Sequence, residues 1–371
     1  MRVGLDYRPV TAAPYSGIAR QVLAMESALA ARPGVEVLRF TACPDGHPHR
    51  QIALCPAQAS PQGGLHRPQE RWRFEAGFLP QALRDSRADV YIATANTGLP
   101  PLGAPEGVRL GLLLHDVFQL TLDNRHASWW KALAYRQIDR LGVRRSVSLA
   151  ERVFTPSRFT AEQAAALFPR HAAKLRVLPN AVPSIAEPVM ASPLNAPYWL
   201  LVGSREPRKN IPWFIEQWRS ARQACPELLP ELALVGSLDD LPPEQRDLPG
   251  LRVLSGVSDA ELAALYRHAE RLWQPSLAEG FGLPVVEAMA QGTPTAVALG
   301  SALDEVALPE APRFDPHQGA ALQRLMRRLA QDGRGRLESP VALRAWAAQF
   351  DMPAYSARLW QWLGEWLGEA W

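Results

Sequence analysis

The stretch that decides the fold is Leu272–Pro294, which reads LWQPSLAEGFGLPVVEAMAQGTP. A short apolar segment, 272–273, leads into a loop of small and polar residues that ends at Gly282. Pro284 marks the start of a helix, because the N–H group that proline lacks would have no partner there. A strand, a glycine-containing loop and a helix in this order predict a cradle for a phosphate or a sugar. The N–H groups of residues 280–283 are expected to face that ligand.

Two carboxylates bracket this turn. Glu279 lies in the loop, and Glu287 is predicted in the first turn of the helix, where the macrodipole favours its ionised form. Ionised oxygens accept strong hydrogen bonds from O–H donors, so the pair suits a hydroxyl-rich ligand. A loop acid and a helix-capping acid without any ligand explain the pair equally well. On the pair alone, both interpretations stay open.

A dinucleotide site is a second interpretation of the same loop. Residues 280–285 match part of a G-x-G-x-x-G fingerprint, but Val285 replaces the third glycine. The stretch also lies late in the chain, and no acidic residue clearly ends a strand about 20 positions later. The sequence therefore disfavours a nicotinamide cofactor.

Length and composition limit the class of protein. The chain has 371 residues, of which 47% are hydrophobic and 21% are charged, and these values predict about two soluble globular domains. A net charge of +3 is too small to argue for nucleic-acid binding. The widely spaced Cys43, Cys55 and Cys225 indicate neither a disulfide framework nor a metal site. With no signal peptide and no apolar run of about 18 residues, we expect a cytoplasmic protein whose membrane contact is at most peripheral.

A second glycine turn carries a run of cations. The segment GSREPRKN, residues 203–210, follows an apolar strand and precedes a helix. Cations that converge on a helix N-terminus form a good diphosphate site, and this interpretation is favoured over a basic surface turn. A third glycine, Gly17, also opens a helix, although an ordinary turn glycine explains it as well.

His115 and Asp116 directly follow the predicted strand 109–114. Open α/β sheets bind ligands at the carboxyl ends of their strands. From its position alone, a packed or solvated loop histidine is the favoured interpretation of His115.

Two other segments are predicted to be helices with prominent tryptophans. Residues 126–148 are predicted helical, with Trp129 and Trp130 near the start and several arginines. A membrane-surface helix and an ordinary amphipathic helix both fit, and the second is slightly favoured. The tryptophan-rich helix 355–371 is apolar over more than half of its circumference, so it must be buried or docked.

The segment from Glu279 to Glu287, EGFGLPVVE, resembles the E-x7-E signature of retaining, nucleotide-sugar-dependent glycosyltransferases of family 4. The resemblance includes the flanking AMAQGTP. It implies the GT-B fold: two doubly wound Rossmann-like α/β domains that face each other across a cleft. The implied parts are an acceptor-side domain (1–183), a linker (184–197), a nucleotide-sugar domain (198–352) and a terminal helix (353–371) that crosses back to the first domain.

The resemblance also assigns roles to residues. It implies a metal-independent enzyme without a cofactor, in which cations replace the metal ion beside the diphosphate. The residues that it makes catalytic are Glu279, Arg205, Lys209 and His115. The donor-binding residues are Gly17, Gly203, Ser204, Val257, Phe281, Gly282, Leu283 and Glu287, and Asp116 is assigned to the acceptor.

The donor rests on a further resemblance. The segments DYR at 6–8 and SGIAR at 16–20 resemble bacterial mannosyl- and rhamnosyltransferases of surface polysaccharide and lipopolysaccharide (O-antigen) assembly. This implies a hexosyltransferase that uses GDP-mannose or GDP-D-rhamnose and a lipid-linked glycan acceptor at the inner membrane face. A UDP-sugar donor stays open. The rival classes are a nucleotide-sugar 2-epimerase and a non-catalytic glycan- or nucleotide-binding protein. The presence of both acids and the phosphate cations argues against the last.

Overall fold

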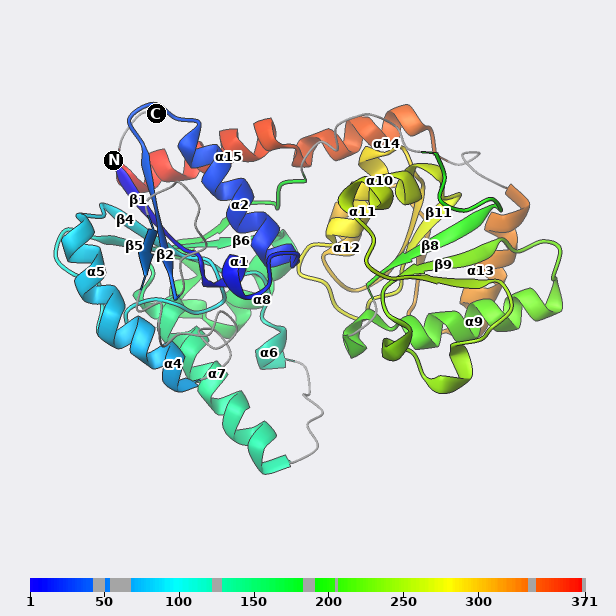
Figure 1. Cartoon of the computed structure of the whole chain (residues 1–371), viewed down its shortest axis with the longest axis horizontal. Coiled ribbons are helices and arrows are strands. Elements are labelled where there is room, and N and C mark those ends of the chain that lie inside the picture. The colour runs from blue at the N-terminus through cyan, green and yellow to red at the C-terminus, as the bar shows by residue number, and fades with distance from the viewer. Residues whose placement is uncertain are drawn as a thin grey trace. The chain divides into compact units, whose positions relative to one another are not determined.

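The computed structural model describes residues 1–42, 51–53, 68–121, 129–182, 191–203, 206–332 and 338–368. The chain divides into two compact units (Figure 1). Unit 1 consists of Met1–Ala181 together with Met352–Trp371, and unit 2 consists of Val182–Asp351. Each unit combines helices with a parallel sheet, which confirms the predicted α/β class. Within the described ranges, no helix is both long and apolar enough to cross a membrane.

The described strands of unit 1 form a parallel sheet in the order β3-β2-β1-β4-β5-β6-β7. This is the strand order of doubly wound folds, in which the order reverses between β1 and β4 and ligands bind beyond the carboxyl ends near that point. The strands are β1 (Arg2–Asp6), β2 (Glu36–Thr41), β3 (Gln51–Ala53), β4 (Val90–Ala93), β5 (Arg109–Leu113), β6 (Arg152–Thr155) and β7 (Leu175–Val177).

The helices of unit 1 follow the expected alternation with strands. They are α1 (Arg8–Ala12), α2 (Gly17–Ala30), α4 (Pro68–Trp72), the π-helical turn η1 (Arg73–Phe78), α5 (Leu79–Ser86), α6 (Phe118–Thr121), α7 (Trp129–Leu149), α8 (Arg158–Leu167), the 3-10 turn η2 (Pro169–Lys174) and α15 (Met352–Leu367). Ser157 caps α8, because its hydroxyl accepts a hydrogen bond from the Thr160 N–H.

The sequence predicts loops at residues 6–16, which include two prolines, and at 43–68, which are rich in Pro, Gly, His and Gln. In the structure, residues 6–16 include α1, and the described part of 43–68 includes β3 and the start of α4. A buried ion pair joins the end of β1 to the start of α1: Arg8 Nη2 is 2.7 Å from Asp6 Oδ2, and both side chains are buried.

The terminal helix α15 packs within unit 1, as the resemblance implied. Its buried face carries Tyr355, Leu359, Trp360, Leu363 and Trp366. Each of three indole N–H groups has an acceptor in unit 1: Trp360 donates to the carbonyl of Ala28, Trp362 to that of Val177, and Trp366 to Glu151. The apolar face predicted from sequence is therefore covered by the unit itself.

Unit 2 repeats the same topology. Its described strands are parallel in the order β10-β9-β8-β11-β12-β13, with the reversal between β8 and β11. The strands are β8 (Tyr198–Val202), β9 (Glu231–Val235), β10 (Leu251–Leu254), β11 (Arg271–Gln274), β12 (Thr295–Ala298) and β13 (Arg313–Phe314). Leu200 of β8 pairs with Leu272 of β11, so the segments that leave these two strands start side by side.

The helices of unit 2 include the one that follows the glycine-containing loop predicted to hold a phosphate or a sugar. They are α9 (Ile211–Ala224), α10 (Asp259–His268), α11 (Leu283–Ala290), α12 (Leu303–Val306), α13 (Gly319–Asp332) and α14 (Pro340–Ala347), with the 3-10 turns η3 (Pro207–Lys209), η4 (Leu238–Asp240), η5 (Pro243–Gln245) and η6 (Ala348–Phe350). Apolar side chains from α11, α14 and the strands form one core of this unit, and those from α9, α13 and the strands form another.

Candidate functional site

The predicted strand, loop and helix are present as β11, residues 275–282 and α11. Gly282 is the N-cap of α11 and has φ +105°, a conformation that favours glycine. A Cβ atom at this position would lie 2.5 Å from Leu303 Cδ2. The helix begins at Leu283, so Pro284 is its second residue. The backbone turn therefore depends on glycine for both its dihedral angle and its close packing.

Glu279 is the centre of the polar contacts in this loop. Its side chain is only 7% exposed, and Oε1 accepts hydrogen bonds from Lys209 Nζ at 2.5 Å, Ser276 Oγ at 2.8 Å and Gln274 Nε2 at 3.0 Å. Oε2 accepts from Arg208 Nη1 at 2.9 Å. The structure thus joins two of the residues predicted as catalytic, Glu279 and Lys209, in a buried ion pair.

These contacts keep the carboxylate ionised. Burial alone would raise the pKa of Glu279, but the charges of Lys209 and Arg208 outweigh it and lower the pKa below its ordinary value. Burial alone would lower the pKa of Arg208, but Glu279 and Glu206 outweigh it and raise that pKa. Glu279 and Arg208 therefore both carry their charges at neutral pH.

The cations of this cluster come from the turn that follows β8. Arg208 and Lys209 lie in η3, and Asn210, with φ +58°, turns the chain into α9. Gly203 has φ +87° at the end of β8, and among the described residues other than its chain neighbours no atom lies within 4 Å of where a Cβ would stand. The predicted site residues Ser204 and Arg205 lie outside the described residues.

The second acid of the pair has a different position from the one we expected. Glu287 is the fifth residue of α11 and not in its first turn, because the helix consists of residues 283–290. The prediction that the helix N-terminus holds its charge was therefore wrong. Glu287 is buried, and Oε2 accepts a hydrogen bond from the Tyr266 hydroxyl at 2.7 Å.

The remaining predicted donor residues of unit 2 lie around this turn. The Phe281 side chain is buried and meets the Phe350 ring edge-to-face, with centroids 5.4 Å apart. Leu283 and Val257 are partly buried against the same core. Their side chains are core residues, so any donor contact at these positions falls to the backbone.

In unit 1, His115 lies just beyond the end of β5. Its N–H donates to Asn96 Oδ1 at 2.8 Å, and its ring Nε2 is 2.7 Å from the carbonyl oxygen of Thr94. A carbonyl oxygen only accepts, so Nε2 carries the hydrogen and Nδ1 is the acceptor of the neutral ring. Burial lowers the pKa of His115, while the Thr94 hydrogen bond and Asp116 oppose this effect. The ring is therefore neutral at neutral pH.

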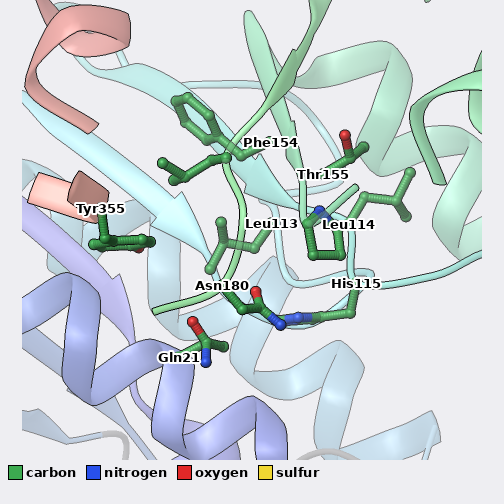
Figure 2. A pocket seen from close by; sticks show the side chains of 10 residues that line it. Gln21, Leu113, Leu114, His115, Phe154, Thr155, Asn180 and Tyr355 are labelled. Atoms are coloured by element: carbon green, nitrogen blue, oxygen red, sulfur yellow. The ribbon is translucent and has the colours of Figure 1, made fainter. Parts of the chain in front are cut away.

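A small pocket lies beside this histidine (Figure 2). Gln21 of α2, Asn180 and Tyr355 of α15 line it together with His115. Gln21 is also fixed, because its amide donates to the carbonyl of Ala181 and accepts from the Ala181 N–H. Polar side chains from α2, from α15 and from the segment after β7 thus line the pocket together with the imidazole.

The other predicted residues of unit 1 have local structural contacts. Asp116 Oδ1 accepts a hydrogen bond from the Phe118 N–H at 3.2 Å, at the start of α6. Gly17 is the exposed first residue of α2, and Ser16 caps that helix by accepting from the Ala19 N–H. Gly17 does not line the His115 pocket, but Gln21, one helical turn later, does.

Several residues of the two sites were not singled out from sequence. In unit 2 they are Arg208, Gln274, Ser276 and Tyr266, and in unit 1 they are Thr94 and Asn96. Arg208 lies in the quoted cation run, so its charge was a signal. The others are neutral side chains: Gln274 and Ser276 lie in the same strand-loop segment as their partner Glu279, whereas Tyr266, Thr94 and Asn96 are about 20 residues from their partners in sequence.

Comparisons with known proteins cover both units. The family described as "Glycosyltransferase Family 4" matches residues 15–184, and the family described as "Glycosyl transferases group 1" matches residues 196–332. The first lies within unit 1 except for its last residues, and the second lies within unit 2.

Curated relatives are mannosyltransferases that match part of the chain. An MMP alpha-(1->4)-mannosyltransferase of Mycolicibacterium hassiacum is 38% identical over 138 residues, 32% of this chain and 34% of the relative. The O-antigen chain mannosyltransferase RfbU of Salmonella typhimurium is 31% identical over 176 residues, 45% of this chain and 47% of the relative. The matched region thus spans a third to a half of each relative's length.

Solved structures share the fold over the whole chain. A sucrose-phosphate synthase from Thermosynechococcus elongatus superposes with a TM-score of 0.68 at 19% identity and covers 99% of both chains. A glycosyltransferase from Rickettsia africae gives a TM-score of 0.69 at 13% identity, with 100% of this chain and 99% of the other covered. Given these matches and the two parallel sheets, the chain belongs to the glycosyltransferases that join a family 4 domain to a group 1 domain, and it has the GT-B fold.

Proposed function

We propose that this protein is a retaining hexosyltransferase that moves a sugar from a nucleoside-diphosphate sugar to a hydroxyl group of a glycan. The observation that supports this most directly is the cluster of Glu279 with Lys209 and Arg208 beside the N-terminus of α11. A buried acid beside two cations offers an acceptor for sugar hydroxyls and positive charge for a diphosphate in the same place.

In the proposed reaction, the bond between the anomeric carbon and the diphosphate breaks towards an oxocarbenium-like state. Lys209 and Arg205 stabilise the negative charge that develops on the leaving diphosphate. Glu279 and the amides of residues 281–283 hold the sugar hydroxyls, and Glu287 holds the ribose hydroxyls. We assign no protein nucleophile; the acceptor attacks the same face, guided by the leaving phosphate.

The neutral ring of His115 fits a role beside the donor sugar. With Nε2 donating to Thr94, Nδ1 accepts a hydrogen bond from a hydroxyl group. Asp116, at the same strand end, is the proposed acceptor contact, and Gly17 is the proposed phosphate contact of unit 1. The cations take the role that a metal ion plays in other enzymes, so we propose that the reaction needs no metal.

For the donor we propose a GDP-sugar, GDP-mannose or GDP-D-rhamnose, and for the acceptor a lipid-linked or polysaccharide glycan. The mannosyltransferase names of the relatives support this choice. The alternatives are a UDP-sugar donor and a nucleotide-sugar 2-epimerase, which would convert or hydrolyse its nucleotide sugar without an acceptor.

We further propose that the protein works in the cytoplasm and contacts the inner membrane face peripherally. Leu141, Arg144 and Arg145 are exposed on α7, a combination that suits an anionic lipid surface. Sedimentation with vesicles that contain phosphatidylglycerol tests this, because binding should fall as salt is raised. Absence of binding at low salt would contradict the membrane contact and leave the transferase proposal intact.

A thermal-shift panel of GDP, UDP, ADP and dTDP, each with and without EDTA, tests the proposed function. A ligand that binds only the folded state raises the free energy of unfolding, by about 2.7 kcal/mol at a ligand concentration of a hundred times Kd. This stabilisation raises Tm. We expect a shift with GDP that EDTA does not change. A shift with UDP alone would overturn the donor, and loss of the shift with EDTA would overturn metal independence.

Turnover completes the test. In a folded Glu279→Ala variant, we expect sugar transfer from GDP-mannose or GDP-rhamnose to fall by about a hundredfold or more, as for other groups that stabilise charge in a transition state. Normal turnover would rule out the role of Glu279. Failure of all four nucleotides to shift Tm in the wild type would instead favour a binding protein.

A further inference from the structure

We propose that Arg208 is a positioning residue that holds and neutralises Glu279, so that Lys209 can move from Glu279 to the diphosphate of the donor. This deepens the proposed function and rests on it, because the diphosphate is the group that would take Lys209. No role was assigned to Arg208 from the sequence motif, which pairs Lys209 with Arg205.

The two oxygens of Glu279 have different partners. Oε1 accepts from Lys209, Gln274 and Ser276, and Oε2 accepts from Arg208. If the ammonium of Lys209 leaves, Oε1 keeps two neutral donors and Oε2 keeps its cation. The carboxylate then stays hydrogen-bonded and its charge stays compensated, so the departure of Lys209 does not leave a bare buried charge.

Arg208 is fixed to the loop that carries Glu279. Besides Glu279, Nη1 donates to the carbonyl of Ala278 at 3.0 Å, and the Arg208 carbonyl accepts from the Leu277 N–H at 2.7 Å. Its Nε donates to Glu206. A guanidinium held at several points by its planar fork keeps one orientation, which suits a residue that positions another.

Lys209 has the opposite character. Its ammonium contacts Glu279, and its side chain remains 16% exposed. A lysine ammonium is a compact charge on a flexible four-carbon stem, so it can change partner at little conformational cost. The two neighbouring cations thus have different roles. Arg208 binds the carboxylate of Glu279, and Lys209 binds either that carboxylate or the phosphate.

A thermodynamic cycle on nucleotide binding tests this division. The variants are Arg208→Gln, Glu279→Gln and the double variant, and the readout is the Kd of GDP and of UDP measured by calorimetry. In Arg208→Gln, Glu279 retains Lys209 as its remaining cation, so the affinity should fall about tenfold to a hundredfold. In the double variant the acid is neutral, Lys209 is released, and most of the affinity should return.

The competing role gives the opposite result. If Arg208 contacts the diphosphate itself, Glu279→Gln cannot restore binding in the Arg208→Gln background, and that outcome overturns the proposal. An unchanged Kd in Arg208→Gln overturns it too. Binding of the nucleotide alone does not involve the sugar, so the cycle reports on the cations and not on turnover.

Two further variants serve as controls. Arg219→Gln removes an exposed arginine that pairs with Glu216 on α9, and it should leave the Kd unchanged. Arg208→Lys keeps a cation near Oε2 without the fork and should show a smaller loss; it also supplies the measurement if Arg208→Gln does not fold. If the wild type binds neither GDP nor UDP, the proposed function fails first, whereas binding without rescue contradicts only this inference.

Discussion

The Tyr266 hydroxyl donates a hydrogen bond of 2.7 Å to Glu287 Oε2, and both side chains are buried. Tyr266 comes from α10 and Glu287 from α11. Glu279 is held in a similar way by Gln274 and Ser276. Both acids of the E-x7-E pair are therefore oriented by neutral buried neighbours before any substrate arrives, as preorganised binding groups should be.

Tyr266→Phe should weaken donor binding without slowing the chemical step. The phenylalanine fills the same space but no longer orients Glu287, which we assign to the ribose far from the reacting bond. A contact that is equal in ground and transition states affects KM and leaves kcat unchanged, so we expect donor KM to rise about tenfold. Steady-state kinetics with the proposed GDP-sugar donor measures both KM and kcat.

The matched control is Tyr198→Phe. The Tyr198 hydroxyl is also buried and donates to a backbone carbonyl, that of Leu265, at 2.8 Å. It should lose similar stability and keep the wild-type KM. A fall in kcat for Tyr266→Phe, or an equal rise in KM for both variants, would contradict the assigned role of Glu287.

The elements of the fold were largely predictable because most are long or strongly patterned. The strand, loop and helix at 272–294 were predicted correctly, and the start of α11 differed by one residue from the proline signal. The short elements α1 and β3 were missed, since neither is long enough to show a period. At the start of α1, Arg8 forms a buried pair with Asp6, and burial of that kind is not visible in the order of residues.

The charged residues of the candidate site were predictable from the sequence, but the side chains that they contact were not. Lys209 and Glu279 are separated by 70 residues, and they meet because β8 and β11 are neighbours in the sheet. The order of residues shows that each strand ends in a polar turn, but not that these two turns adjoin. For the same reason, the contact of Arg208 with Glu279 could not be predicted although Arg208 lies in the predicted cation run, and Tyr266 was missed.

Lowering the pH should destabilise the wild type through His115. Burial holds the pKa of the folded ring below the ordinary 6.5, so below pH 6.5 the unfolded chain binds a proton more readily than the folded one. The stabilising contribution of the neutral ring is therefore complete above pH 6.5 and decreases as the pH falls towards the folded pKa. Tm measured from pH 8 to pH 5.5 should fall more steeply for the wild type than for His115→Gln.

The same residue offers a spectroscopic check. Nitrogen-15 shifts of the His115 imidazole should show hydrogen on Nε2, because the carbonyl of Thr94 accepts from it. Parallel Tm curves for the two proteins, or hydrogen on Nδ1, would show that the ring does not have the protonation state on which its proposed hydroxyl contact depends.

Alanine at two glycines should have unequal effects on stability. Gly203 and Gly282 both have positive φ. Among the described residues, the new methyl group would meet another side chain, Leu303, at Gly282 and none at Gly203. We expect Gly203→Ala to lower the free energy of unfolding by about 1–2 kcal/mol through backbone strain alone. Gly282→Ala adds a clash and should cost about 3 kcal/mol or more.

A second substitution separates strain from crowding. Leu303→Ala removes the atoms that the new methyl group would meet, so Gly282→Ala should cost less in that background than in the wild type. Urea unfolding of the four proteins gives the coupling. Equal costs in both backgrounds would mean that α12 does not constrain the turn at the N-terminus of α11.

Trp366 packs α15 against the rest of unit 1. Its buried ring lies against Phe154, with centroids 6.4 Å apart, and a Cβ at Gly111 would stand 3.1 Å from the indole. Trp366→Ala should lower the free energy of unfolding by about 3–5 kcal/mol, because the side chain leaves a cavity over the sheet. Trp366→Phe should cost less, since it loses mainly the hydrogen bond to Glu151.

Gly111 provides the internal control for this contact. Gly111→Ala should destabilise the wild type by crowding the indole, but in the Trp366→Ala background the added methyl group enters the cavity and should be neutral or stabilising. Gln361→Ala, on the exposed side of α15, should leave the stability within about 0.5 kcal/mol of the wild type. A Gly111→Ala cost that persists without the indole would show that backbone effects, and not the packing of α15, make glycine necessary in β5.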